Sequence, residues 1–120
     1  MNKPLITQRI KQKAFELGFS FAGISRAEFL ENEARDLEKW LSENRHGKMA
    51  YMENYFDKRT DPRLLVDNAK SVITVLQNYY STSKQHDKNA PKISMYALGK
   101  DYHFVIRDKL NRLHDFIKDE

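Results

Sequence analysis

Apolar residues recur at helical spacing in three segments of the chain. The first stripe consists of Ile6, Ile10, Ala14 and Leu17, the second of Leu30, Ala34, Leu37 and Leu41, and the third of Ile106, Leu110, Leu113 and Ile117. Such spacing places the apolar side chains on one face of a helix. We therefore predict a first helix that starts near Pro4 and ends just before Gly18, a second that ends near the His46-Gly47 breaker, and a closing helix.

Three short segments are rich in β-branched and aromatic residues, which favours strands. They are Phe19–Ser25, Ser71–Tyr80 and Lys92–Ala97. Between them we predict a short helix at Met49–Phe56, a polar turn at Asp57–Arg63 with Asp61 capping whatever begins at Pro62, and a polar loop at residues 81–91. The pattern predicts a mixed α/β (α+β) fold with a small sheet of about three strands flanked by about four helices.

Length and composition are those of one ordinary globular domain. The chain has 120 residues, of which 40% are hydrophobic and 32% charged. It contains neither an apolar run long enough to span a bilayer nor the apolar core of a secretory signal. We expect a cytoplasmic protein without a membrane partner.

Cysteine and histidine usage narrows the chemistry. The sequence has no cysteine, which excludes a disulfide, a thiolate nucleophile and a cysteine-ligated iron–sulfur cluster within these residues. The four histidines are scattered without metal-ligand spacing, so no metal site is predicted. The phosphate-loop, dinucleotide-binding and nucleophile-elbow motifs are also missing, which removes the ordinary nucleotide-binding and hydrolase classes.

Charge is unevenly distributed along the chain. Residues 1–26 carry five basic groups and one acidic group, whereas residues 27–45 carry three basic and six acidic groups. The basic first helix, with Lys11 and Lys13, therefore allows the hypothesis of a stand-alone RNA-binding module. The alternative interpretation is a solvated helix face.

Polar and aromatic residues gather where the predicted strands end, which is where mixed sheets tend to hold ligands. The candidate binding residues are Asn78, Tyr79, Tyr96, Ala97, Gly99, Asp101, Tyr102 and His103, together with Arg59 in the polar turn. Each also has a structural interpretation. Asp101 can be the N-cap of the closing helix, Gly99 can supply a positive φ, and Arg59 can pair with a nearby aspartate. The sequence leaves these alternatives open.

Four segments, in this order and spacing, carry a family resemblance. They are "LGFSFAGIS", "HGKMAYMENYFDKRTDPRLL", "AKSVITVLQNYY" and "YALGKDYH". Together they resemble the N-terminal region of epoxyqueuosine reductases, and the resemblance covers nearly the whole chain. It implies an oxidoreductase of queuosine synthesis that reduces epoxyqueuosine in the anticodon of tRNA. It also implies a cobalamin cofactor, two 4Fe-4S clusters, a nitroreductase-like cobalamin-binding core and a monomeric full-length protein.

Transferred to this chain, the resemblance assigns cofactor contacts to Arg59 in "RTDPR" and to Tyr96, Ala97, Gly99 and Asp101 in "YALGKDYH". Asn78, Tyr79, Tyr102 and His103 are expected as neighbours. A corrin ring is a wide apolar disc with amides at its rim, which suits aromatic side chains, a close backbone approach at Gly99 and the forked donor of Arg59. We expect Arg59 and Gly99 to converge on its edge.

The chain also departs from the family pattern. Val66-Asp67-Asn68 replaces a Pro-Gly turn, and the family's catalytic aspartate and cluster cysteines belong to blocks beyond Glu120. The resemblance therefore implies an N-terminal fragment without catalytic residues or a ferredoxin-like domain, inactive alone. A related cobalamin- or flavin-dependent reductase of a small molecule is the alternative, because a fold constrains the cofactor better than the substrate.

Overall fold

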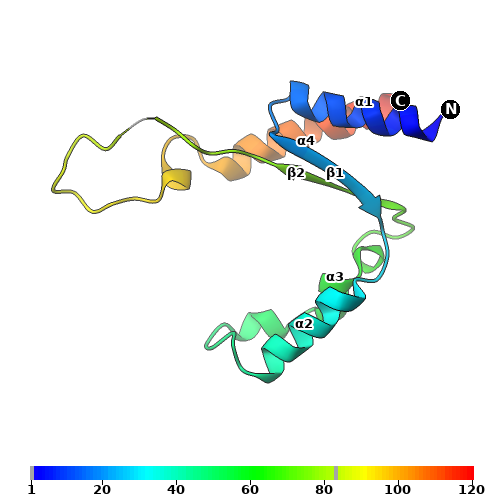
Figure 1. Cartoon of the computed structure of the whole chain (residues 1–120), viewed down its shortest axis with the longest axis horizontal. Coiled ribbons are helices and arrows are strands. Elements are labelled where there is room, and N and C mark those ends of the chain that lie inside the picture. The colour runs from blue at the N-terminus through cyan, green and yellow to red at the C-terminus, as the bar shows by residue number, and fades with distance from the viewer. Residues whose placement is uncertain (1, 83) are drawn as a thin grey trace. The chain divides into compact units, whose positions relative to one another are not determined.

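The computed structural model describes residues 2–82 and 84–120, which form two compact units. Unit 1 consists of the chain up to Gly23 together with Thr74–Glu120, and unit 2 consists of Ile24–Ile73. Figure 1 labels the helices and strands of both units. In the described part of the chain, no helix combines the length and the apolar character that crossing a bilayer requires.

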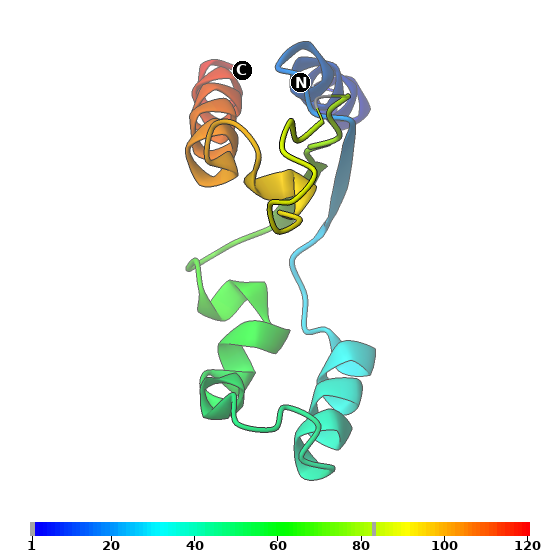
Figure 2. The ribbon, with the colours of Figure 1, turned by 90° about the vertical axis from the view of Figure 1, so that its left-hand side faces the viewer.

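Two helices frame unit 1. Helix α1 spans Lys3–Glu16 and α4 spans Tyr102–Asp119, and Figure 2 shows them side by side. Their buried residues, Ile10 and Ala14 on α1 and Leu113 on α4, belong to the predicted apolar stripes. The first and closing helices are therefore confirmed. Gly18 follows α1 with a φ of +93°, the left-handed conformation that favours glycine after a helix.

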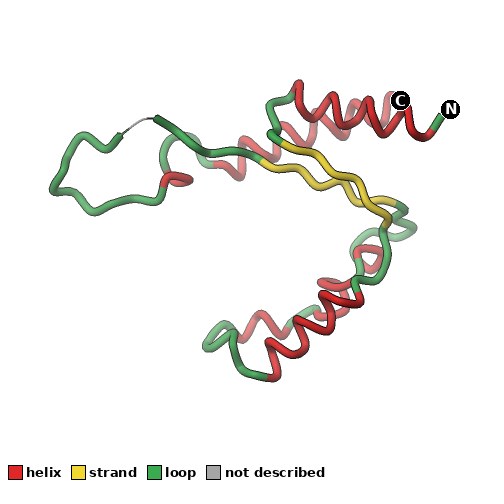
Figure 3. The backbone as a smooth tube through the Cα atoms, in the orientation of Figure 1, coloured by secondary structure: helices red, strands yellow, loops and turns green. Residues whose placement is uncertain are grey.

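The sheet is an antiparallel pair formed by β1, Phe21–Arg26, and β2, Ser71–Leu76 (Figure 3). The Ser20 N–H donates to the Leu76 carbonyl at 2.9 Å, and the Ala27 N–H donates to the Lys70 carbonyl at 3.0 Å. The mixed α/β class is confirmed, with four α-helices and a sheet of two strands in the described residues.

The predicted third strand is wrong. Within Lys92–Ala97 the structure has η3, a 3-10 helix at Met95–Ala97, in which the Ala97 N–H donates to the Ser94 carbonyl at 2.9 Å. The second strand also ends earlier than predicted, at Leu76, and the Asn78 side chain then accepts a hydrogen bond from the Tyr80 N–H at 2.9 Å. Residues 77–80 belong to no helix, strand or turn, so the Asn78 side chain, rather than a strand partner, takes the Tyr80 N–H. The predicted polar loop 81–91 has neither helix nor strand in its described residues, and Ser83 lies outside them.

Unit 2 contains α2 at Glu31–Ser42, η1 at Ala50–Glu53, α3 at Phe56–Thr60 and η2 at Pro62–Leu64. The second helix is confirmed, with its Glu31–Arg35 ion pair at 3.4 Å. It ends at Ser42 rather than near His46, because Asn44 takes a φ of +53° and the chain leaves the helical path.

The predicted short helix and polar turn have the wrong boundaries. Tyr55 adopts a left-handed φ of +59°, which separates η1 from α3 and places residues 57–60 in a helix rather than in a turn. The predicted cap is confirmed: the Asp61 carboxylate accepts the Arg63 N–H at 3.0 Å. It also accepts Arg63 Nε at 2.9 Å and Nη2 at 2.7 Å, and these hydrogen bonds hold the pKa of Asp61 below its usual value.

Candidate functional site

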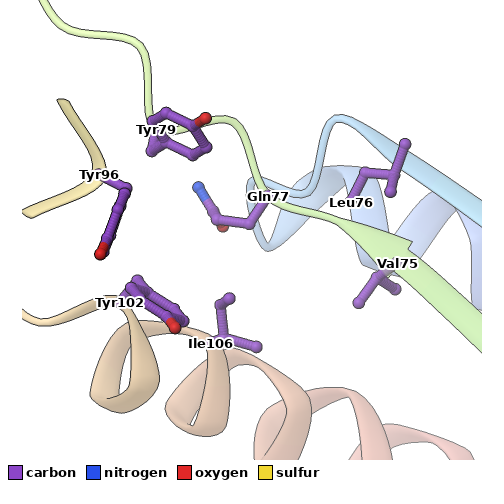
Figure 4. A pocket seen from close by; sticks show the side chains of 7 residues that line it. All are labelled: Val75, Leu76, Gln77, Tyr79, Tyr96, Tyr102 and Ile106. Carbon is purple, nitrogen blue, oxygen red and sulfur yellow. The ribbon is translucent and has the colours of Figure 1, made fainter. Parts of the chain in front are cut away.

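A cavity of about 360 Å³ lies in unit 1 between the end of β2 and the start of α4 (Figure 4). We call it the tyrosine cavity. It is lined by Val75, Leu76, Gln77, Tyr79, Tyr96, Tyr102 and Ile106. Three of the predicted site residues, all tyrosines, therefore share one concave surface, although they come from three different segments of the chain.

The tyrosine rings touch edge to face. The ring centroids of Tyr79 and Tyr96 are 6.3 Å apart and those of Tyr96 and Tyr102 are 5.9 Å apart, each pair with an interplanar angle of 78°. This geometry is favourable for aromatic pairs. The rings still face solvent, since Tyr79 is 61% exposed and Tyr96 is 51% exposed. The cavity can thus offer aromatic surface to a ligand without first opening.

Asp101 organises the start of α4. Its carboxylate accepts the His103 N–H at 2.9 Å, as an N-cap does, and lies 2.8 Å from His103 Nδ1. These bonds to His103 hold the pKa of Asp101 below its usual value. The His103 ring stacks on Tyr102, with centroids 4.1 Å apart. The capping interpretation of Asp101 is confirmed, and its contact with a cofactor stays a prediction.

The remaining predicted residues of unit 1 lie beside the cavity rather than in its lining. Asn78 accepts the Tyr80 N–H just after β2, Ala97 is exposed in η3, and Gly99 has a φ of +85°. A Cβ added to Gly99 would meet no atom within 4 Å. Glycine at this position is therefore explained by its positive φ and not by crowding from other atoms of the chain.

Arg59 belongs to unit 2, where it holds the backbone around the left-handed Tyr55. Its Nε donates to the Asn54 carbonyl at 2.9 Å, and its Nη2 donates to the Tyr51 carbonyl at 3.4 Å. It does not need the aspartate partner that the sequence suggested. A guanidinium has five N–H donors, so three remain for a ligand. The convergence of Arg59 with Gly99 stays a prediction.

Arg59 also lines a hollow of about 410 Å³ in unit 2, together with Tyr55, Lys58 and Leu65. The ammonium of Lys58 lies 5.5 Å from the centroid of the Tyr55 ring, within the range of a cation–π contact. In the residues that the structure describes, no group of three or more histidine or acidic side chains is placed to hold a metal ion.

Sequence reasoning missed Gln77, Ile106 and Lys109. Gln77 and Ile106 line the tyrosine cavity, and Lys109 contacts Gln77. Ile106 and Lys109 could have been placed near Tyr102 from the sequence, because positions 102, 106 and 109 share one face of a helix. Gln77 directly precedes the predicted Asn78 and Tyr79, but glutamine in a strand carries no distinctive signal.

Comparison with known proteins gives consistent matches. The family model described as "Epoxyqueuosine reductase QueG, DUF1730" matches residues 59–120, just over half of the chain. A protein of Leadbetterella byssophila named epoxyqueuosine reductase is 59% identical over 114 residues, which cover 95% of this chain and 37% of that protein. The protein of the same name from Escherichia coli K12 is 35% identical over 127 residues, covering 98% of this chain and 33% of that protein.

Solved structures agree with these sequence matches. The epoxyqueuosine reductase of Streptococcus thermophilus superposes with a TM-score of 0.80 and 27% identity, over 99% of this chain and 32% of that one. A second epoxyqueuosine reductase, solved with an epoxyqueuosine-modified tRNA stem loop, also gives a TM-score of 0.80, with 26% identity over 99% of this chain and 32% of that one. The chain thus spans about a third of the length of its relatives. Because the family model covers more than half of it, the chain belongs to the epoxyqueuosine reductase family.

Proposed function

We propose that this chain forms the N-terminal part of an enzyme that reduces epoxyqueuosine to queuosine in tRNA. The main support is the set of relatives of that name, which match 95–98% of the chain at 35–59% identity. A related structure that contains an epoxyqueuosine-modified stem loop supports tRNA as the substrate. A cytoplasmic location and a monomeric full-length protein belong to the same proposal.

Cobalamin is the cofactor that we propose for the full-length protein. The exposed tyrosine rings, and the open space where an added Gly99 Cβ would meet no atom, fit one apolar face of a corrin ring. The residues that would hold it are Arg59, Asn78, Tyr79, Tyr96, Ala97, Gly99, Asp101, Tyr102 and His103. When bound, cobalamin would deliver to the epoxide the electrons supplied by two 4Fe-4S clusters on cysteines outside these 120 residues.

This chain's own residues would bind and orient rather than react. The edge-to-face tyrosines present apolar surface, and the Asp101–His103 pair fixes the first turn of α4 on which Tyr102 stands. The three N–H groups of Arg59 that remain after its two hydrogen bonds to backbone carbonyls can donate to amide or phosphate oxygens. We therefore assign the catalytic residues to the remainder of the full-length protein.

The experiment is deletion of the full-length gene in its host, followed by mass spectrometry of nucleosides from digested tRNA. We expect queuosine to disappear, epoxyqueuosine to accumulate, and the wild-type gene to restore queuosine. Unchanged queuosine would refute the proposed substrate. If the purified full-length protein nevertheless binds hydroxocobalamin, the alternative of a cobalamin-dependent reductase of a small molecule is favoured.

The cofactor assignment has its own test. Titration of the purified full-length protein with hydroxocobalamin, followed by absorbance, should give weaker binding for Tyr96→Ala than for wild type, because the variant removes an exposed ring from the proposed wall. Tyr80→Ala is the matched control, since Tyr80 is also an exposed tyrosine but does not line the cavity. Equal losses in the two variants would refute the tyrosine cavity as the cofactor wall.

A further inference from the structure

The side-chain amide of Gln77 is held at both ends. Its Oε1 accepts a hydrogen bond from Lys109 Nζ at 2.7 Å, and its Nε2 donates to the Asn78 carbonyl at 3.0 Å. An ammonium group can only donate and a backbone carbonyl can only accept. Both contacts therefore require the same amide orientation, with the oxygen toward Lys109.

Lys109 is itself anchored by three groups in unit 1. Besides Gln77, its Nζ lies 3.5 Å from the Gly18 carbonyl and 5.5 Å from the centroid of the Phe19 ring, and Phe19 is only 2% exposed. Across residues 2–82 and 84–120 no carboxylate pairs with this ammonium, so carbonyl dipoles and a ring face compensate its charge. A flipped Gln77 amide would replace an acceptor by a second donor, which the ammonium disfavours.

The orientation of this amide matters because Gln77 lines the tyrosine cavity. Figure 4 shows its nitrogen facing the space bounded by Tyr79, Tyr96 and Tyr102. An amide nitrogen has two hydrogens, of which the Asn78 carbonyl takes one. The tyrosine hydroxyls can rotate to donate or to accept, whereas the polarity of Gln77 is set by its two partners.

We propose that Lys109 is a positioning residue that makes the tyrosine cavity selective for hydrogen-bond acceptors. The ligand class is a planar, largely apolar group that carries a carbonyl-type oxygen, stacked against the tyrosine rings and bonded to the free N–H of Gln77. This inference rests on the proposed function, since the tyrosine cavity is the wall assigned there to the corrin ring, and it adds the hydrogen-bonding polarity of that wall. The probe experiment uses no cobalamin, so its failure and a failure of the cobalamin titration are distinguishable.

The test uses the ¹⁵N-labelled 120-residue chain and two planar probes. N-methyl-2-pyridone has a carbonyl acceptor and no N–H, whereas indole has an N–H donor and no comparable acceptor. Dissociation constants come from NMR shifts of the Gln77 side chain and the cavity backbone amides. The decisive quantity is the ratio of the two constants in each variant relative to the wild-type ratio, because the difference in hydrophobicity between the probes is the same in every variant and cancels in this comparison.

Gln77→Glu is the central variant, because it is nearly isosteric and keeps an acceptor for Lys109. It replaces the donor that faces the cavity by a carboxylate oxygen. We expect the ratio to move toward indole by about tenfold, the effect of one good hydrogen bond. Lys109→Glu should move it the same way by flipping the amide, and Lys109→Arg, which retains the donor, should leave it near wild type.

Lys118→Glu is the matched control, because it makes the same charge change on α4 at an exposed lysine, and the ratio should stay unchanged. A merely structural role for Lys109 would weaken both probes equally in Lys109→Glu and would leave the ratio unchanged. The proposal is overturned if Gln77→Glu leaves the ratio at its wild-type value, or if neither probe shifts the cavity resonances of the wild-type chain. Where Lys109→Glu does not fold, Gln77→Glu still tests the Gln77 donor, and a changed ratio in Lys109→Arg would contradict the positioning role of Lys109.

Discussion

Replacing Leu113 by alanine is expected to destabilise unit 1 by about 3 kcal/mol. Leu113 is 3% exposed on α4, the helix that packs against α1. The substitution removes three carbon groups from the interior, and at about 0.8 kcal/mol for each buried group the transfer loss is about 2.4 kcal/mol. The cavity left behind adds to this loss, because the surrounding helices relax only in part.

Leu110→Ala is the matched control on the same helix. Leu110 is 40% exposed, so the same truncation removes only about 1.5 kcal/mol of burial and opens no closed cavity. Urea unfolding followed by circular dichroism measures both losses, and hydrogen exchange of the α1 and α4 amides assigns them to unit 1. Equal losses for the two variants would refute the packing of α4 through Leu113.

Three further predictions concern the residues around the candidate site. The pKa of Asp101 is lowered in the folded state, so its ionised form stabilises the fold above the ordinary aspartate pKa of 3.8, and this contribution is lost as the pH falls through the lower folded value. The difference in urea midpoint between wild type and Asp101→Asn should therefore vanish in acid, and a difference that stays constant with pH would contradict the cap. Gly99→Ala should lower the free energy of unfolding by about 1 kcal/mol because of the positive φ alone, whereas Gly18→Ala should lower it further, since the added Cβ would lie 3.0 Å from Lys109 Nζ. Thermal unfolding ranks the two variants, and the reverse order would refute the close approach of Lys109 to Gly18. Arg59→Lys should lose the paired hydrogen bonds of the guanidinium to two backbone carbonyls and raise the amide hydrogen-exchange rates of residues 51–59. Unchanged rates would show that these hydrogen bonds are dispensable.

Prediction from the sequence worked where a residue's role is local. Asp101 was expected as an N-cap and Asp61 as the cap of whatever begins at Pro62, and each carboxylate accepts the backbone N–H two residues further on. Capping depends on a side chain and an amide two residues away, so spacing alone reveals it. The strand predicted at Lys92–Ala97 was wrong for the opposite reason, because its formation depends on a distant partner. Its composition suits a strand, but a strand needs a neighbour with which to pair, and no local pattern supplies one.

Sequence patterns alone predicted the three amphipathic helices and the mixed α/β class, excluded cysteine chemistry within these residues and, through four short segments, indicated the family. The cavity shared by Tyr79, Tyr96 and Tyr102, and the contact of Lys109 with Gln77, 32 positions away, are visible only in the folded chain. The physical reason is the range of the forces. Helical periodicity and capping act within a few residues, whereas a cavity is formed by segments brought together by burial of Phe19, Leu113 and their neighbours.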